Sequence, residues 1–84
     1  MADITIYTTS YCPYCVRAKE LLTRKGASFK EINAEDDTAR EEMVAKAGGR
    51  RTVPQIFIGE KHVGGCDDLY ALDKDGKLDA LLAA

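Results

Sequence analysis

Hydrophobic residues follow two different spacings along the chain, and each spacing predicts one type of secondary structure. Residues 4–8 are mostly β-branched or aromatic, which is typical of a strand. Over residues 13–25, apolar residues recur every three or four positions, as on one face of a helix. Basic residues in the last turn and Gly26 are expected to mark the end of this helix. Its apolar face consists of Cys15, Ala18, Leu21 and Leu22.

The same two spacings predict the elements in the rest of the chain. Apolar segments at residues 55–58 and 61–63 flank Gly59-Glu60, and a two-residue connection with glycine first suits a type II′ hairpin turn. The other predicted elements are a strand over residues 28–33, a helix over residues 38–47 with Met43, Val44 and Ala47 facing inward, a helix from Cys66 or Asp67 to Leu72, and a short amphipathic segment over residues 78–82.

The order of these elements, strand–helix–strand–helix–strand–strand–helix, predicts an α/β fold with a mixed sheet. A strand–helix–strand unit has a right-handed crossover and brings its two strands together in parallel. The hairpin adds antiparallel strands, and the helices are expected to cover both faces of the sheet. Because the chain has only 84 residues and no linker-like segment, we expect a single domain over residues 1–84.

Composition and charge narrow the classes of function. Hydrophobic residues make up 45% of the chain and charged residues 31%, as in ordinary globular domains. A net charge of -2 gives no reason to expect nucleic acid or an anionic membrane as a partner. The first residues lack the basic and apolar segments of a secretory signal, and no apolar run approaches the ~18 residues of a membrane span. We therefore expect a cytoplasmic protein that binds neither nucleic acid nor membrane.

The chain has three cysteines, and the spacing of Cys12 and Cys15 carries the chemistry. An odd number fits poorly with a disulfide-stapled secreted domain, whereas C-x-x-C between a strand and a helix is typical of redox catalysis. Unpaired N–H groups and the helix dipole at this junction favour a thiolate, the form that attacks disulfides. Pro13 suits the first helical position. Because the helix should shield Cys15 more, we predict Cys12 as the attacking thiol and Cys15 as the resolving thiol.

Two other interpretations of these cysteines remain open at this point. Both residues could belong to the core, because cysteine is often buried. They could also bind a metal ion together with Cys66 or His62. Zinc normally takes four ligands, commonly as two spaced pairs, and the second pair is absent from this sequence, so we expect no metal. Cys66 is interpreted as a small packing residue and His62 as a surface residue.

Three motifs resemble those of bacterial dithiol glutaredoxins, in the order and at the spacing of that family. They are Cys12-Pro13-Tyr14-Cys15, Thr52-Val53-Pro54-Gln55-Ile56-Phe57-Ile58 and Gly64-Gly65-Cys66-Asp67-Asp68. The resemblance spans nearly the whole chain. It implies a thioredoxin fold, with a four-stranded mixed sheet of two parallel strands plus an antiparallel hairpin, flanked by three or more helices on both faces. It also implies a cis peptide bond before Pro54, which would face the cysteines.

The resemblance further implies a glutathione-dependent thiol–disulfide oxidoreductase that reduces protein–glutathione mixed disulfides and protein disulfides. Cys12 and Cys15 would form the redox-active disulfide, with glutathione as co-substrate. The implied partners are glutathionylated or disulfide-containing proteins, such as reductases that need a dithiol donor, and a monomer is expected. The rival interpretations are a thioredoxin-like donor reduced by a flavoprotein, against which Tyr14 and residues 64–68 argue, and an iron–sulfur or zinc module, against which Pro13 and Cys15 argue.

The resemblance also assigns the glutathione contacts. The backbone of Val53 would pair with the cysteinyl part of glutathione, and N–H groups at the start of the third helix would hold its γ-glutamyl carboxylate. We expect Asp67 both to cap this helix and to bind the α-amino group, and Arg50 or Arg51 to reach the glycyl carboxylate. The family often has lysine where this chain has Thr9, so the thiolate depends more on the helix terminus. The predicted glutathione-binding residues are Tyr14, Arg51, Thr52, Val53, Pro54, Gly65, Cys66 and Asp67.

Overall fold

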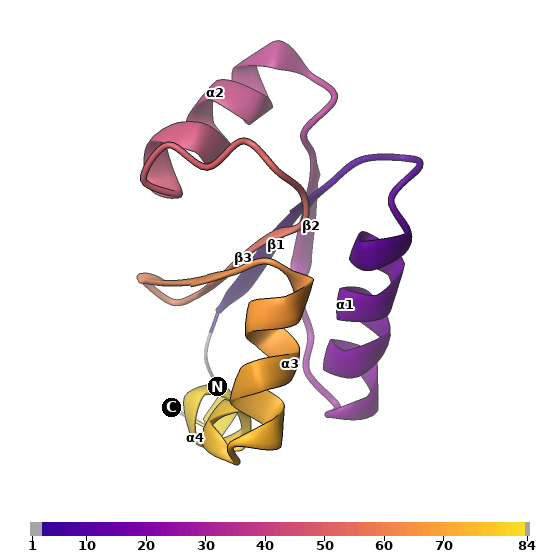
Figure 1. The fold of residues 1–84 in the computed structure, drawn as a ribbon, viewed down its shortest axis with the longest axis vertical. Coiled ribbons are helices and arrows are strands. Elements are labelled where there is room, and N and C mark those ends of the chain that lie inside the picture. Colours follow the sequence, from indigo (N-terminus) through magenta and orange to yellow (C-terminus); the bar gives the residue numbers. More distant parts are fainter. Residues whose placement is uncertain (1–2, 84) are drawn as a thin grey trace.

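The computed structural model describes residues 3–83, and its elements follow the predicted order. Figure 1 shows a central sheet with helices on both sides. The strands lie side by side in the order β2-β1-β3-β4. The elements are β1 (Ile4–Thr8), α1 (Pro13–Arg24), β2 (Lys30–Asn33), α2 (Asp37–Lys46), β3 (Gln55–Ile58), β4 (Lys61–Gly64), α3 (Cys66–Lys74) and α4 (Lys77–Ala83).

β1 lies inside the sheet and pairs with two strands. It runs parallel to β2, with Thr5 opposite Lys30, and antiparallel to β3, with Tyr7 opposite Gln55. β3 and β4 form the antiparallel hairpin, and Gly59 between them has a φ of 60°, as the first central position of a type II′ turn requires. The predicted four-stranded mixed sheet of the thioredoxin-fold class is therefore confirmed.

Alternate residues of the central strands face two separate hydrophobic cores. Because successive side chains of a strand point to opposite faces, Ile6 packs toward α1, α3 and α4, whereas Tyr7 packs toward α2. On the α2 side, Tyr7 meets Phe57 edge to face at 5.8 Å and packs with Met43. Helices thus cover both faces, as predicted (Figure 1). The larger core contains Ile4, Ile6, Ala18, Leu21, Leu22, Ile56, Ile58, Cys66, Leu69 and Leu78.

Two element boundaries differ by two residues from the sequence-based predictions, and several others differ by one. β2 begins at Lys30, two residues later than expected, because the preceding segment still belongs to the end of α1. There the Ala27 N–H donates to the Leu22 carbonyl at 3.0 Å. α3 continues past Leu72 to Lys74. The prediction ended too early because the last turn is polar and the spacing of apolar residues does not extend into it.

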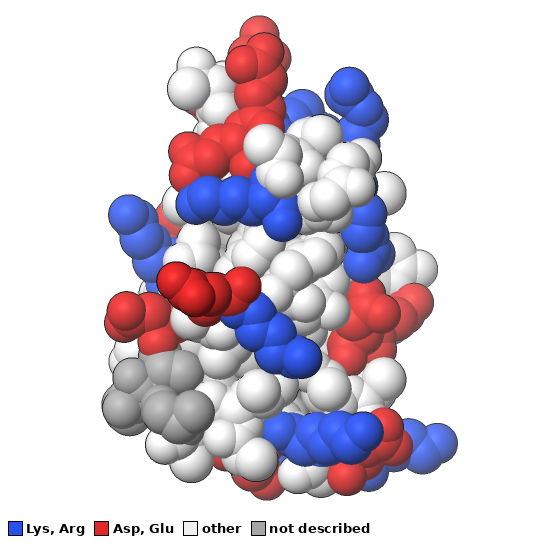
Figure 2. Space-filling model, turned by 90° about the vertical axis from the view of Figure 1, so that its left-hand side faces the viewer, with Lys and Arg blue, Asp and Glu red and all other residues white. Residues whose placement is uncertain are grey.

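Charges of both signs are mixed on the face shown in Figure 2, where Lys and Arg lie among Asp and Glu around an uncharged area. Some opposite charges pair along helices, as Lys46 and Glu42 do at 3.0 Å, and each exposed pair contributes little to stability. Among residues 3–83, no helix combines the length and the hydrophobicity that crossing a membrane requires.

The N-cap of α2 predicts a stability difference between two neighbouring aspartates. The Asp36 carboxylate accepts a hydrogen bond from the Ala39 N–H at 3.0 Å, whereas Asp37 is the first helical residue and acts through the helix dipole. We expect Asp36→Ala to lower the free energy of unfolding by about 1 kcal/mol and Asp37→Ala by roughly 0.3–0.5 kcal/mol. Urea denaturation of both variants measures the difference, and equal losses would contradict this account of the cap.

Candidate active site

Cys12 lies at the junction between β1 and α1. Its extended backbone (φ -134°, ψ 100°) makes it the N-cap of α1, and Pro13 takes the first helical position, as predicted. The Cys12 Sγ accepts a hydrogen bond from the Cys15 N–H at 3.1 Å. Besides this N–H, the Cys15 thiol also forms a hydrogen bond with Cys12. The sulfur therefore lies at the positive end of the α1 dipole, against two groups of Cys15.

Cys15 differs from Cys12 in its exposure to solvent. Both are free cysteines, but Cys12 is partly exposed whereas Cys15 is only 1% exposed. Burial and, secondarily, the hydrogen bond with Cys12 raise the pKa of the Cys15 thiol to about 12. At neutral pH, therefore, Cys15 is a buried, protonated thiol, and the neighbouring Cys12 sulfur is the accessible one.

The loop that leads to Cys12 is held by the segment that follows β2. The Ala34 N–H donates to the Thr8 carbonyl at 2.7 Å. Two residues after Thr8, the Ser10 N–H donates to the carboxylate of Glu35, the neighbour of Ala34, at 2.5 Å. Hydrogen bonds from Ser10 lower the pKa of the Glu35 carboxyl. These contacts fix the path of the chain from the end of β1 to the cysteine.

A second segment approaches the cysteines from the start of β3. The peptide bond between Val53 and Pro54 is cis, which confirms the prediction from the family resemblance. The Val53 carbonyl oxygen lies 3.7 Å from the Cys12 Sγ and accepts a hydrogen bond from the thiol. The backbone at Val53 therefore runs directly beside the sulfur, where an extended ligand could pair with it.

A groove of about 160 Å³ lies between α1, residues 50–54 and the start of α3. All the residues predicted to bind glutathione line this groove except Arg51. Arg51 lies in a separate hollow beside α2, where its carbonyl accepts a hydrogen bond from Arg40 at 3.1 Å, and Arg50 lines the groove instead. The lining residues are Tyr14, Arg50, Thr52, Val53, Pro54, Gly65, Cys66, Asp67 and Asp68.

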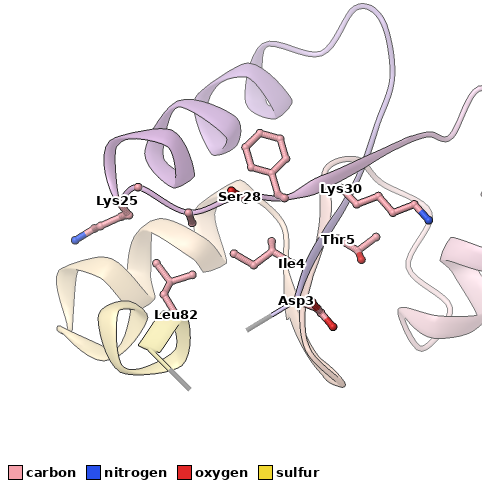
Figure 3. Close-up of a pocket in the computed structure, with 10 residues that line it drawn as sticks. Asp3, Ile4, Thr5, Lys25, Ser28, Lys30 and Leu82 are labelled. Carbon is pink, nitrogen blue, oxygen red and sulfur yellow. The ribbon is translucent and has the colours of Figure 1, made fainter. Parts of the chain in front are cut away.

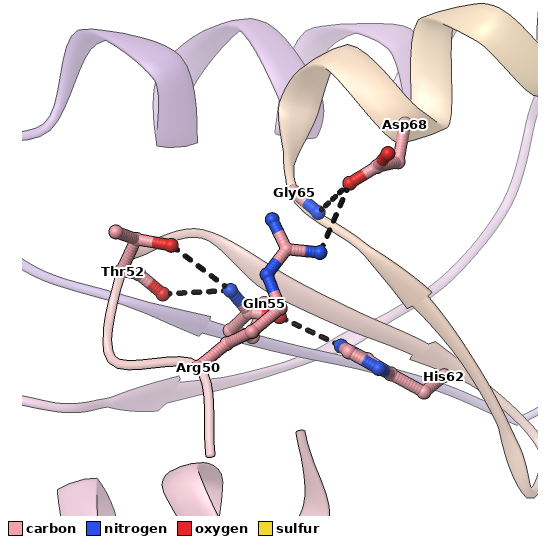
Figure 4. Close-up of polar contacts among 6 residues, drawn as sticks. All are labelled: Arg50, Thr52, Gln55, His62, Gly65 and Asp68. Atoms are coloured by element: carbon pink, nitrogen blue, oxygen red, sulfur yellow. Dashed lines mark hydrogen bonds and ion pairs between the residues drawn. The ribbon is translucent and has the colours of Figure 1, made fainter. Parts of the chain in front are cut away.

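Arg50 and Asp68 form an ion pair at one side of the groove (Figure 4). The Arg50 Nη1 lies 3.2 Å from the Asp68 Oδ2, which also accepts a hydrogen bond from the Gly65 N–H at 2.9 Å. The Gly65 N–H, and then Arg50, lower the pKa of the Asp68 carboxyl. Gly64 has a φ of 116°, and a Cβ there would collide with the Asp68 carboxylate. Gly65 is thus the N-cap of α3, and Asp68, the third helical residue, accepts its N–H, so the prediction that Asp67 would cap the helix is wrong.

Tyr14 and Cys66 line the groove with opposite exposure. Tyr14 is 55% exposed, and the Arg17 guanidinium lies 5.9 Å from the centre of its ring, within the range of a cation–π contact. Cys66 is buried, as expected for a packing residue, and burial followed by the charge of Asp67 raises the pKa of its thiol. Tyr11, at 95% exposure, projects into solvent. Of the three cysteines, Cys12 alone has an accessible sulfur.

Gln55 and His62 are polar residues beside the groove that the sequence analysis did not assign to it. Gln55 is 0% exposed, and its side chain binds both Thr52 and His62 (Figure 4). His62 was expected at the surface, but it is half-buried because its ring stacks on Phe57 with 4.9 Å between the ring centres. A glutamine in an otherwise apolar strand was the signal that could have revealed this pair.

A larger hollow, of about 650 Å³, lies at the amino end of β1 (Figure 3). Asp3 and Thr5 line one side of it and Leu82 of α4 lines another. Because Cys12 follows the carboxyl end of the same strand, this hollow is remote from the cysteines. Among residues 3–83, no three His, Cys, Asp or Glu side chains gather closely enough to hold a metal ion.

The arrangement around Cys12 suits thiol–disulfide exchange. An accessible sulfur at a helix N-terminus can attack a disulfide, and a buried thiol one turn later can displace the product. The adjoining groove is lined by Val53 and by the charged residues Arg50 and Asp67. Those features fit an extended, peptide-like ligand with charged ends.

Comparison with known proteins agrees with this chemistry. A family model described as Glutaredoxin matches residues 4–63. A glutaredoxin from Pseudomonas aeruginosa (strain PAO1) is 57% identical over 84 residues, covering 100% of both chains. Glutaredoxin 3 from Escherichia coli (strain K12) is 57% identical over 82 residues, covering 98% of this chain and 99% of the relative.

Solved structures of glutaredoxins also superpose on the fold. A solution structure of glutaredoxin from Brucella melitensis has a TM-score of 0.86 and 61% identity, covering 98% of this chain and 89% of that one. The crystal structure of a buckwheat glutaredoxin–glutathione complex has a TM-score of 0.88 and 35% identity, covering 98% of this chain and 77% of that one. The chain belongs to the glutaredoxin family, whose members are thiol–disulfide oxidoreductases.

Proposed function

We propose that this protein reduces mixed disulfides between glutathione and protein thiols, and also protein disulfides, with Cys12 as nucleophile and Cys15 as resolving thiol. The observation that carries the proposal is the accessible Cys12 sulfur at the N-terminus of α1, beside a groove and above a buried thiol. The buckwheat relative crystallised with glutathione supports glutathione as the ligand of this groove.

The first reaction is a thiol–disulfide exchange at Cys12. The Cys12 thiolate attacks the glutathione sulfur of the mixed disulfide, and the bond between glutathione and the protein substrate breaks. The substrate leaves as a thiolate and takes a proton from solvent. A second glutathione thiolate then attacks the sulfur of the bound glutathione, which releases oxidised glutathione and restores the Cys12 thiolate.

The second reaction uses both cysteines on a protein disulfide. Cys12 attacks one substrate sulfur and releases the other as a thiolate, which leaves a mixed disulfide between Cys12 and the substrate. Cys15 loses its proton and attacks the Cys12 sulfur, which frees the reduced substrate and forms the Cys12–Cys15 disulfide. Two glutathione molecules then reduce that disulfide and leave as oxidised glutathione. The high pKa of Cys15 keeps it protonated until the mixed disulfide has formed.

The groove holds glutathione along its length in this proposal. The backbone of Val53 pairs with the cysteinyl part of the tripeptide, and the N–H groups of Cys66 and Asp67 at the start of α3 hold the γ-glutamyl carboxylate. Asp67 binds the α-amino group, a role compatible with the hydrogen bond of the Asp68 carboxylate to the Gly65 N–H. We assign the glycyl carboxylate to Arg50 rather than Arg51, because Arg50 lines the groove.

The proposal extends to partners and location. The partners are glutathionylated and disulfide-containing proteins, including reductases that consume a dithiol donor. The protein works as a monomer in the cytoplasm, where a reducing environment keeps Cys12 and Cys15 as thiols. A net charge of -2 favours neither nucleic acid nor membrane as a partner.

Serine variants separate the roles of the two cysteines. We expect Cys12→Ser to abolish turnover of a small glutathione mixed disulfide, because the nucleophile is gone. Cys15→Ser should keep that turnover and lose reduction of protein disulfides, because only the second reaction needs the resolving thiol. Oxidation of NADPH by glutathione reductase measures both reactions. Loss of mixed-disulfide turnover in Cys15→Ser would show that the roles are assigned incorrectly.

Alkylation tests the difference in exposure and ionisation. At about pH 8, iodoacetamide should add one group per molecule, on Cys12, because a thiol with a raised pKa is protonated and unreactive below that pKa. Burial and the raised pKa values protect Cys15 and Cys66. Peptide mass spectrometry identifies the site, and unfolding in urea provides the control with three adducts. Early labelling of Cys15 in the folded protein would contradict the structure.

Two adjacent arginines provide a matched test of the glycyl contact. We expect Arg50→Gln to raise the KM for glutathione about five- to tenfold, as the loss of a charge-assisted hydrogen bond would. Arg51→Gln should leave that KM within about twofold, because Arg51 lies outside the groove. Steady-state assays with varied glutathione concentration measure both values. A larger rise in the KM for Arg51→Gln than for Arg50→Gln would show that Arg51 binds the glycyl carboxylate.

A further inference from the structure

Gln55 is a buried polar side chain to which the proposed reactions give no role. It is 0% exposed, and the other three residues of its strand, β3, are apolar. Its backbone pairs with Tyr7 of β1, so it is anchored in the middle of the sheet. A buried amide is costly unless it is hydrogen-bonded, and Gln55 satisfies its hydrogen-bonding groups within the protein.

The partners of Gln55 determine how its amide is oriented. The Nε2 atom lies 2.9 Å from the Thr52 carbonyl oxygen and 3.2 Å from the Thr52 Oγ1. A carbonyl oxygen can only accept a hydrogen bond, so the atom facing it must be the amide nitrogen. The Oε1 of Gln55 therefore faces the His62 Nε2, at 2.7 Å. Since Oε1 can only accept, the His62 Nε2 must carry a proton.

His62 is a stable donor in this position. Its ring stacks on Phe57 at an interplanar angle of 27°. Figure 4 shows its Nε2 edge turned toward Gln55. Burial, followed by the positive charge of Arg50, lowers the pKa of His62, and Asp68 acts in the opposite direction. The Nε2 proton is present in the imidazolium and in this neutral tautomer, so the hydrogen bond to Gln55 survives titration of the ring.

We propose that Gln55 and His62 are positioning residues that hold Thr52 so that the backbone of Val53 stays in register with the Cys12 sulfur. This inference rests on the proposed binding of glutathione along Val53. His62 orients the Gln55 amide, the amide holds both oxygens of Thr52, and the next residue places its carbonyl 3.7 Å from the Cys12 Sγ. The pair does not touch glutathione in this arrangement, so it acts on the reaction only through residues 52–53.

Two substitutions of His62 separate its hydrogen bond from its packing. His62→Phe keeps an aromatic ring on Phe57 but removes the N–H donor, whereas His62→Gln supplies an amide N–H at a similar reach without the ring. If positioning matters, His62→Phe should raise the KM for glutathione about fivefold, the factor expected for one hydrogen bond, and His62→Gln should largely restore it. Lys61→Ala, at an exposed neighbouring position, is the matched control.

Gln55→Glu tests the other end of the pair. Glutamate keeps the length of the side chain and an acceptor for His62, but it cannot donate to Thr52, so the KM for glutathione should rise at least as much as in His62→Phe. Circular dichroism and the melting temperature of each variant show whether it is still folded under the conditions of the assay.

The outcomes distinguish this inference from the proposed function. If the parent protein turns over glutathione mixed disulfides but His62→Phe and Gln55→Glu only lower the melting temperature, at unchanged KM and kcat, the positioning role is wrong and the proposed function stands. If the parent protein shows no such turnover, the proposed function itself fails. In ¹⁵N NMR of the parent, a neutral His62 protonated on Nδ1 instead of Nε2 would overturn the hydrogen-bond assignment directly.

Discussion

The capping of α1 by a sulfur atom is the interaction on which the functional part of this structure depends. Helix N-termini usually take an oxygen from Ser, Thr, Asp or Asn, whereas here the Cys12 Sγ accepts the Cys15 N–H. A thiol is a weaker acceptor than a hydroxyl, but a thiolate in the same position gains from both the N–H donor and the helix dipole. The cap thus places the sulfur at the end of the helix where a negatively charged nucleophile can be held.

The helical period then sets the difference between the two thiols. Cys12 precedes the first turn and remains accessible, whereas Cys15 lies one turn on, on the same face as Leu22, and is buried. Burial raises the pKa of Cys15 to about 12, so this thiol is protonated at neutral pH and shielded, whereas the Cys12 sulfur is partly exposed. The buried apolar face that stabilises α1 therefore also shields the Cys15 thiol from solvent.

The groove beside Cys12 joins segments that are distant in the sequence. Residues 50–54 arrive from α2, and residues 64–68 arrive from the hairpin, with the Arg50–Asp68 ion pair between them. The sheet brings these segments together because β1 pairs with β3 and β3 pairs with β4. Buried polar contacts then fix the loop, since Gln55 binds Thr52 on one side and His62 on the other. The group that these contacts place next to the Cys12 sulfur is therefore a backbone carbonyl, that of Val53.

The sequence by itself determined the order of the elements, the mixed sheet and the reactive cysteine pair. These depend on local spacing, on turn residues and on the C-x-x-C at a strand–helix junction, all of which can be read along the chain. Family resemblance, and not local pattern, supplied the cis bond before Pro54 and the residues of the groove.

Only the tertiary structure decided which of two adjacent residues makes a given contact. Arg50 rather than Arg51 lines the groove, and Asp68 rather than Asp67 pairs with Arg50. It also decided that His62 is half-buried against Phe57. Neighbouring residues of the same type have the same local preferences, so the choice between them depends on which side chain meets a partner from a distant segment of the fold.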